Sequence, residues 1–127
     1  MDGRPHENLT VWKEAMTLVT EIYGVTRTFP REELYGLTSQ MRRAAVSVPS
    51  NIAEGAARDG EKEFVRFLMV ARGSLAELET QLRIAEQLNY FDSSEGLLSK
   101  TNNIGRKLNG LIRQLRNRNS YERTANR

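Results

Sequence analysis

The sequence predicts an all-α protein, an antiparallel up-down-up-down four-helix bundle. Apolar residues recur at steps of three and four along most of the 127 residues, and no stretch alternates apolar and polar residues for long enough to indicate a strand. The breaks in this pattern are short, and short connections between long amphipathic helices favour antiparallel neighbours. A chain of this length forms one domain, and we expect residues 1–117 to make up the bundle.

The first predicted helix covers about residues 9–27 and has a wide apolar face. Its main stripe consists of Trp12, Ala15, Met16, Val19, Ile22 and Tyr23. A second row at seven-residue steps consists of Val11, Leu18 and Val25. Because a four-helix monomer needs only one stripe per helix, we predict that this second row is buried against another subunit. Phe29-Pro30 ends the helix, since the residue before a proline is pushed out of helical geometry.

The second predicted helix, about residues 35–57, contains a proline. Its apolar stripe consists of Leu37, Met41, Ala44, Ala45, Val48 and Ile52. Pro49 lies within this stripe and lacks an N–H, so we expect a kink. Asn51 falls on the apolar side, and burial of an unpaired amide costs roughly 1–3 kcal/mol. We therefore predict that Asn51 is largely buried and bonded to another helix.

The third and fourth predicted helices show the spacing of a bundle seam. The third, about residues 61–89, repeats through Phe64, Leu68, Ala71, Leu75, Leu78, Leu82 and Ala85. The fourth, about residues 93–117, repeats through Leu97, Ile104, Leu108, Leu111 and Leu115. Asp92 and Glu95 have the spacing of a capping box before this helix. Residues 118–127 are polar and basic, and we predict a disordered tail there.

The segment YGLTSQMRRAAVSVPSNIAEG, residues 35–55, identifies a family. Its blocks RRAA and NIAEG, with Phe29-Pro30 before them and Ala71-Arg72-Gly73-Ser74-Leu75 after them, resemble the four-helix bundle proteins encoded in intervening sequences of bacterial 23S ribosomal RNA genes. The resemblance covers about residues 8–116, and accessory proteins of diversity-generating retroelements look similar. We assign a structural motif within it to Pro49, Asn51, Glu54 and Gly55.

This resemblance implies a homopentamer around a central channel, with nucleic-acid binding and no enzymatic activity. One departure is Gly60, where the family often has serine. Glycine is also accepted as a helix N-cap, so the departure concerns only the strength of that cap.

The composition argues against catalysis. The chain has no cysteine, which excludes thiolate chemistry and cysteine–zinc sites and fits a reducing cytoplasm. The one histidine, His6, lies beside Pro5 in a segment that we expect to be flexible, so no serine–histidine pairing can be argued, and no Glu-x-x-His motif for a di-iron centre is present. The glycines follow no strand, so they form no phosphate loop. We expect no catalytic residue, metal or cofactor, and rank an enzyme last among the functional classes.

No apolar run approaches the ~20 residues that span a bilayer. The first residues, MDGRPHEN, also lack the apolar core of a signal peptide. We therefore expect a soluble, cytoplasmic protein without a membrane partner.

The net charge of +3 is unevenly distributed. Residues 1–99 contain 11 basic and 15 acidic residues, a balance of −4, whereas residues 100–127 contain 8 basic residues and Glu122 as their one acid, a balance of +7. Such asymmetry indicates a polyanion-binding end, although a merely solvated basic tail is the alternative.

The predicted nucleic-acid-binding residues are basic and lie on the second and fourth helices. They are Arg42, Arg43, Arg58, Arg106, Lys107, Arg113, Arg116 and Arg118. Arg106 and Arg113 point opposite the apolar seam, and the planar arginine fork suits phosphate. Only Tyr121 is near them for base stacking, which predicts backbone contacts with little sequence preference.

Two further features bear on assembly. Gly73 in mid-helix costs about 1 kcal/mol relative to alanine, which favours a subunit contact over a tolerated surface glycine. One flank of the second helix is polar and consists of Gln40, Arg43, Ser47, Glu54 and Arg58. This flank is either a polar seam between protomers or a set of pairs within the monomer, with Glu54 and Arg58 at the spacing of a helical ion pair.

The function that these observations favour is a non-enzymatic homo-oligomeric scaffold that binds RNA or DNA, with RNA preferred on the strength of the resemblance. The alternative is an oligomeric adaptor that recruits a protein partner and uses its basic residues for solubility.

Overall fold

The structure, a computed structural model, describes residues 3–125, with side chains up to residue 118. Its elements in chain order are the short 3-10 helix η1 (Pro5–Asn8), α1 (Thr10–Thr26), the short 3-10 helix η2 (Arg31–Glu33), α2 (Leu37–Ala56), α3 (Glu61–Gln87) and α4 (Glu95–Ala125). The described residues contain four α-helices and no strand, which confirms the all-α prediction. None of these helices has the length and apolar character needed to cross a membrane.

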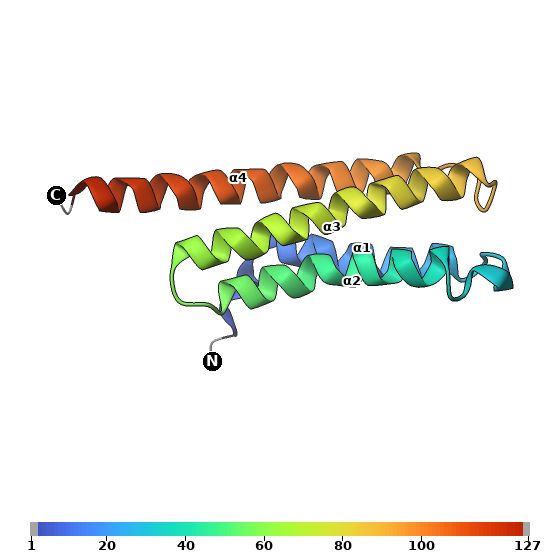
Figure 1. The fold of residues 1–127 in the computed structure, drawn as a ribbon, viewed down its shortest axis with the longest axis horizontal. Helices are drawn as coiled ribbons and strands as arrows, with labels where there is room; N and C mark the ends of the chain where they lie inside the picture. Colours follow the sequence, from blue (N-terminus) through green and yellow to red (C-terminus); the bar gives the residue numbers. More distant parts are fainter. Residues whose placement is uncertain (1–2, 126–127) are drawn as a thin grey trace.

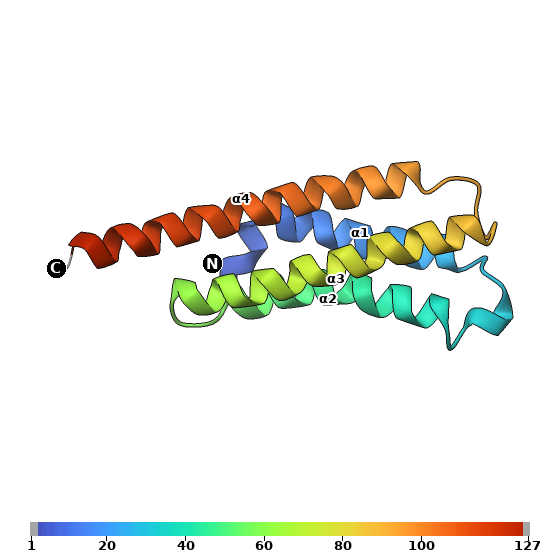
Figure 2. The same ribbon diagram turned by 45° about the horizontal axis from the view of Figure 1, so that its top comes forward.

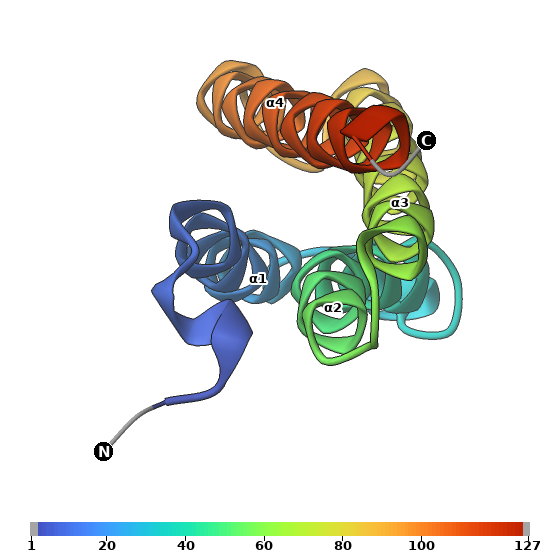
Figure 3. The same cartoon turned by 90° about the vertical axis from the view of Figure 1, so that its left-hand side faces the viewer.

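The four α-helices are arranged in chain order around a shared core. Each α-helix contacts its neighbours in the chain, and α1 also contacts α4. The connections alternate between the two ends of the molecule, and α4 projects past the other helices at its C-terminal end (Figures 1 and 2). An end-on view places α1, α2, α3 and α4 in sequence around the axis (Figure 3). This course is compatible with the predicted up-down-up-down packing.

The core is built from the predicted seams. Fully buried side chains from all four helices include Ala15, Ile22, Met41, Val48, Ile52, Leu68, Leu78, Leu82, Ile104 and Leu108. Val11 and Leu18, which we predicted to contact another subunit, belong to the same core, at 5% and 0% exposure. Together with Ala15, Ile22 and Thr26 they form the single buried stripe of α1, whereas Met16 and Tyr23 of the predicted main stripe are exposed. The subunit-contact prediction is therefore wrong for Val11 and Leu18, and Val25 is half-buried.

Helix α4 differs from its prediction at both ends. It begins at Glu95, and the Glu86 carboxylate accepts hydrogen bonds from the Ser94 N–H (2.5 Å) and hydroxyl (2.6 Å), so the predicted Asp92–Glu95 capping box does not start this helix. It continues to Ala125, so the predicted helix end at residue 117 and the disordered tail are wrong for residues 118–125. Neither proline nor glycine follows Gly110 to stop it. Residues 126–127 lie outside the described part.

Gly55 and Gly60 lie at positions where a larger residue would not fit or would strain the backbone. A β-carbon at Gly55 would lie 2.7 Å from Phe67 Cβ, so glycine allows α2 and α3 to approach closely there. Gly60, the N-cap of α3, has a φ of 94°, a left-handed conformation that disfavours the serine often found in the family. The departure at residue 60 therefore has a backbone cause.

One end of the bundle is closed by a network around Glu33. Its carboxylate accepts hydrogen bonds from the Leu37 N–H (3.0 Å) and the Tyr90 hydroxyl (2.7 Å), which lower the pKa of Glu33 and raise that of Tyr90. Phe29 packs against the rings of Tyr90 and Phe91, at centroid distances of 5.2 and 5.9 Å. The turn between α3 and α4 is thus tied to the start of α2.

Candidate nucleic-acid interface and assembly surfaces

Asn51 of the α2 motif belongs to a hydrogen-bonded cluster with Ser47 of α2 and Ser74 of α3. Helix α2 runs without a break through the buried Pro49. Asn51 is half-buried and donates to the Ser47 carbonyl (2.8 Å) and hydroxyl (2.9 Å). The Ser47 hydroxyl in turn lies 2.8 Å from the Ser74 hydroxyl of α3. The prediction that Asn51 itself bonds another helix is therefore wrong, because Ser47, one turn earlier, faces α3.

The polar flank of α2 divides into two parts. A hollow of about 300 Å³ between α2 and α3 is lined by Gln40, Arg43, Ala44, Ser47, Ser74 and Glu77. Further along the chain, Arg58 pairs with Glu54 at 3.5 Å and lies over the Phe67 ring at 5.1 Å. The predicted Glu54–Arg58 pair is therefore confirmed.

The outer face of α4 carries two exposed cations of the predicted set, and Arg43 of α2 is exposed as well. Arg106 and Arg113 are exposed, and neither has an acidic partner within the described part of the chain. They are two helical turns apart, about 10 Å along the axis. The predicted direction of these two side chains, away from the apolar seam, is confirmed. Tyr121 lies beyond the residues whose side chains are described.

Most other predicted basic residues already have partners. Lys107 pairs with Glu14 of α1, and Arg118 pairs with Glu61 of α3 at 2.9 Å. Arg42 donates to the Thr26 hydroxyl at 2.9 Å and lies over the Tyr23 ring. Arg116 donates to the sulfur of Met69. Because no contact joins α2 to α4 in the described chain, the structure does not gather the eight residues into one surface.

An apolar groove lies between α1 and α2. Its volume is about 300 Å³, and its lining consists of His6, Trp12, Met16, Val19, Val46, Pro49, Ser50 and Ala53. His6 packs edge-on against Trp12, with ring centroids 4.9 Å apart. Met16 and Val46 are 45% and 39% exposed. The sequence analysis missed Val46, whose position outside the α2 stripe was the available signal.

Helix α3 has a small apolar surface on its outward side, at the exposed Met69 and Val70. Gly73 lies one turn further along, and a β-carbon there would meet no atom within 4 Å. Ile84 and Leu88 are also exposed, and the exposed Glu77 and Thr80 separate them from Met69 and Val70. The surplus apolar surface that we sought on α1 thus lies in the α1–α2 groove and on this side of α3.

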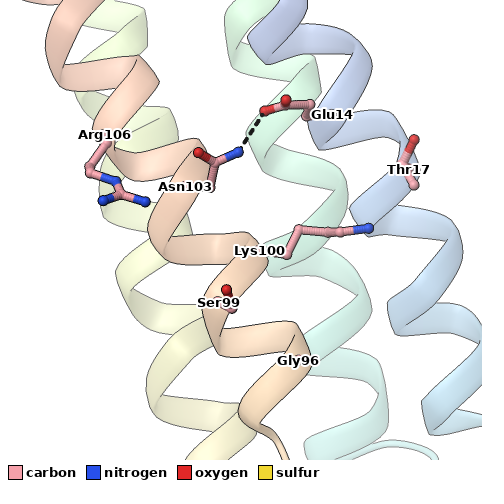
Figure 4. Close-up of a pocket in the computed structure, with 7 residues that line it drawn as sticks. All are labelled: Glu14, Thr17, Gly96, Ser99, Lys100, Asn103 and Arg106. Carbon is pink, nitrogen blue, oxygen red and sulfur yellow. Dashed lines mark hydrogen bonds between the residues drawn. The ribbon is translucent and has the colours of Figure 1, made fainter.

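A polar groove between α1 and α4 is larger than the α2–α3 hollow and the α1–α2 groove. Its volume is about 530 Å³, and its lining consists of Glu14, Thr17, Gly96, Ser99, Lys100, Asn103 and Arg106. Figure 4 shows Asn103 and Glu14 turned toward one another across it. Apart from Arg106, our sequence analysis missed this row, although the positions from 96 to 106 recur at steps of three and four on one face of α4.

No group of three or more potential metal-ligating side chains occurs among the described residues. The sequence model of the family described as 23S rRNA-intervening sequence protein matches residues 7–110. No curated protein matches the chain.

Proposed function

This chain belongs to the 23S rRNA-intervening sequence protein family, and we propose that it is a non-enzymatic, homo-oligomeric scaffold that binds nucleic acid, RNA in preference to DNA. The observation that carries the proposal is the pair Arg106 and Arg113 on the outer face of α4. Both guanidinium groups are exposed, and no acid of the described chain neutralises either one. Arginine donates bidentate hydrogen bonds to phosphate, so this face suits a nucleic-acid backbone.

Self-assembly is supported by two apolar surfaces of different shape. The α1–α2 groove is concave, whereas the outward side of α3 exposes Met69 and Val70 beside the small Gly73. We propose that the α3 side of one subunit docks in the groove of the next. Contacts between different surfaces are heterologous, and they close into a ring when the rotation between subunits allows it. The number five comes from the family resemblance, and a cytoplasmic location stays a prediction.

In a ring the arginine pair of α4 is repeated in every subunit, so a few phosphate contacts per subunit can add up to strong binding of nucleic acid. Each neutralised phosphate adds close to one unit to the slope of log affinity against log salt. We therefore expect strong binding at low salt and a steep loss toward physiological salt.

The test compares two double charge reversals by fluorescence anisotropy with structured RNA and duplex DNA. Arg106→Glu with Arg113→Glu should abolish binding without dissolving the oligomer, because both residues are exposed. Arg27→Glu with Arg83→Glu changes the net charge equally at exposed positions outside α4 and should retain most binding. Equal losses in the two variants, or no binding at low salt, would contradict nucleic-acid binding through α4.

The alternative function is an oligomeric adaptor, and the apolar groove with its His6–Trp12 pair is the observation that favours it. An assembled protein that binds no nucleic acid at low salt would support this alternative.

A further inference from the structure

The groove between α1 and α4 has the size and composition of a polar ligand site. Its volume of about 530 Å³ falls within the range of small-molecule sites. A β-carbon at Gly96 would meet no atom within 4 Å, so the groove is open at that end. Arg106 lies in the same lining, which joins the groove to the arginine face of α4.

The charges that face the groove almost cancel. Glu14 pairs with Lys107 and also accepts from the Asn103 amide at 3.3 Å. Lys100 pairs with Glu21. These two ion pairs leave the Arg106 guanidinium as the cation of the lining without an acidic partner in the described chain. The groove therefore offers one site for an anion, surrounded by neutral or neutralised polar groups.

The remaining polar groups suit a hydroxyl. The Ser99 hydroxyl has no hydrogen-bond partner among the described residues, and the Thr17 hydroxyl donates to the Lys13 carbonyl, which leaves its oxygen free to accept. The Asn103 amide can donate, and the Glu14 carboxylate can accept. A ligand with a hydroxyl next to an anionic group would be matched by this set.

We propose that the α1–α4 groove binds the ribose-phosphate backbone of RNA, with a phosphate at Arg106 and the adjacent 2′-hydroxyl at Asn103 and Ser99. This inference rests on the proposed nucleic-acid binding and specifies its site. The 2′-hydroxyl both donates and accepts, and it distinguishes RNA from DNA at a given site. Deoxyribose would leave these polar groups without a ligand partner, so the groove would discriminate against DNA.

The experiment measures the ratio of RNA to DNA affinity at low salt. The probes are a 20-nucleotide single-stranded RNA, the DNA of the same sequence, and the same RNA with 2′-O-methyl groups, which cannot donate. The wild-type protein should bind the RNA about tenfold more tightly than the DNA, the effect of one to two hydrogen bonds. The 2′-O-methyl RNA should bind like the DNA.

Two variants locate the effect. Ser99→Ala with Asn103→Ala should bring the ratio close to one. Gly96→Leu places a side chain at the open end of the groove, and it should also bring the ratio of RNA to DNA affinity close to one. Leucine has a higher helix propensity than glycine, so this substitution should not weaken α4. Gly24→Leu is the matched control, because Gly24 of α1 is also exposed with no atom near its β-position, and it should keep the wild-type ratio. Thermal unfolding shows that each variant is folded.

The outcomes separate this inference from the function on which it rests. Equal affinity for RNA and DNA, with both lost in the Arg106→Glu and Arg113→Glu variant, would uphold nucleic-acid binding and overturn the groove assignment. An RNA preference that both groove variants retain would also overturn the assignment. Absence of binding to every probe at low salt would overturn both proposals.

Discussion

Gly55 of α2 faces Phe67 of α3 so closely that a β-carbon at position 55 would stand 2.7 Å from Phe67 Cβ. The same β-carbon would lie 3.2 Å from the backbone oxygen of Phe64, which cannot rotate away as a side chain can. Glycine near the end of the family motif therefore has a packing cause.

Gly55→Ala should destabilise the protein by about 1–3 kcal/mol, the usual cost of overpacking. The direction is informative, because alanine in place of a helical glycine otherwise stabilises by about 1 kcal/mol. Urea denaturation measures the change, and Gly24→Ala, where a β-carbon would meet no atom within 4 Å, should give the stabilising result. A Gly55→Ala variant as stable as the wild-type protein would show that α2 and α3 can separate without cost.

Ser47→Ala should cost more stability than Ser74→Ala. The Ser47 hydroxyl contacts both the Asn51 amide and the Ser74 hydroxyl, whereas Ser74 makes one of these contacts. At about 1 kcal/mol for each hydrogen bond, we expect losses of about 2 and 1 kcal/mol. Denaturant unfolding of both single variants and the double variant checks this, and the double variant should resemble Ser47→Ala. Additive losses would mean that the serine pair is not coupled.

The stability of the protein should decrease at acidic pH in part because Glu86 becomes protonated. Hydrogen bonds from the Ser94 hydroxyl and N–H lower the pKa of Glu86. A carboxyl whose folded pKa is lowered stabilises the protein above its unfolded value of about 4.3, and this contribution disappears as the pH falls through the folded pKa. The Glu86→Gln variant should therefore have a lower free energy of unfolding than the wild-type protein at pH 7. Its free energy of unfolding should also decrease less steeply than that of the wild-type protein as the pH falls below 5.

The measurement is the urea midpoint as a function of pH. Glu32→Gln serves as the control, because the Glu32 carboxylate accepts no hydrogen bond in the described chain. A wild-type and a Glu86→Gln curve of the same shape would exclude this role for Glu86.

Val46→Glu and Gly73→Leu should each break the oligomer without unfolding the bundle. The first places a charge in the α1–α2 groove, and the second adds bulk to the α3 surface, so each variant keeps one of the two surfaces intact. An equimolar mixture should then form a heterodimer through the intact groove of one variant and the intact α3 surface of the other. Light scattering gives the masses. Single variants that assemble like the wild-type protein would contradict the heterologous contact.

Periodicity predicted the helices and much of the core, because a step of three or four residues directly encodes a buried stripe. On α1 the pattern contained two overlapping rows and did not show which residues of each row face the core, and for that reason Val11 and Leu18 were assigned to a subunit contact. Which side chain of α2 bonds α3, Ser47 or Asn51, depended on the rotation of α2 against α3, and the pattern of one helix does not contain this rotation. Of the candidate nucleic-acid residues, the exposed Arg106 and Arg113 were predictable from their position opposite the seam. The partners of Lys107 and Arg118 come from α1 and α3, which only the assembled bundle brings near.

The packing of each helix on its neighbours in the chain has a consequence for folding kinetics. Most contacts join residues that are close in sequence, and chains of low contact order fold in microseconds to milliseconds. The contact between α1 and α4 is different, since Glu14 and Lys107 come from opposite ends of the bundle sequence. Forming it requires closure of the longest loop in the molecule, with the largest entropic cost. The two terminal helices should therefore meet late, after α2 and α3 have formed the nucleus on which both dock.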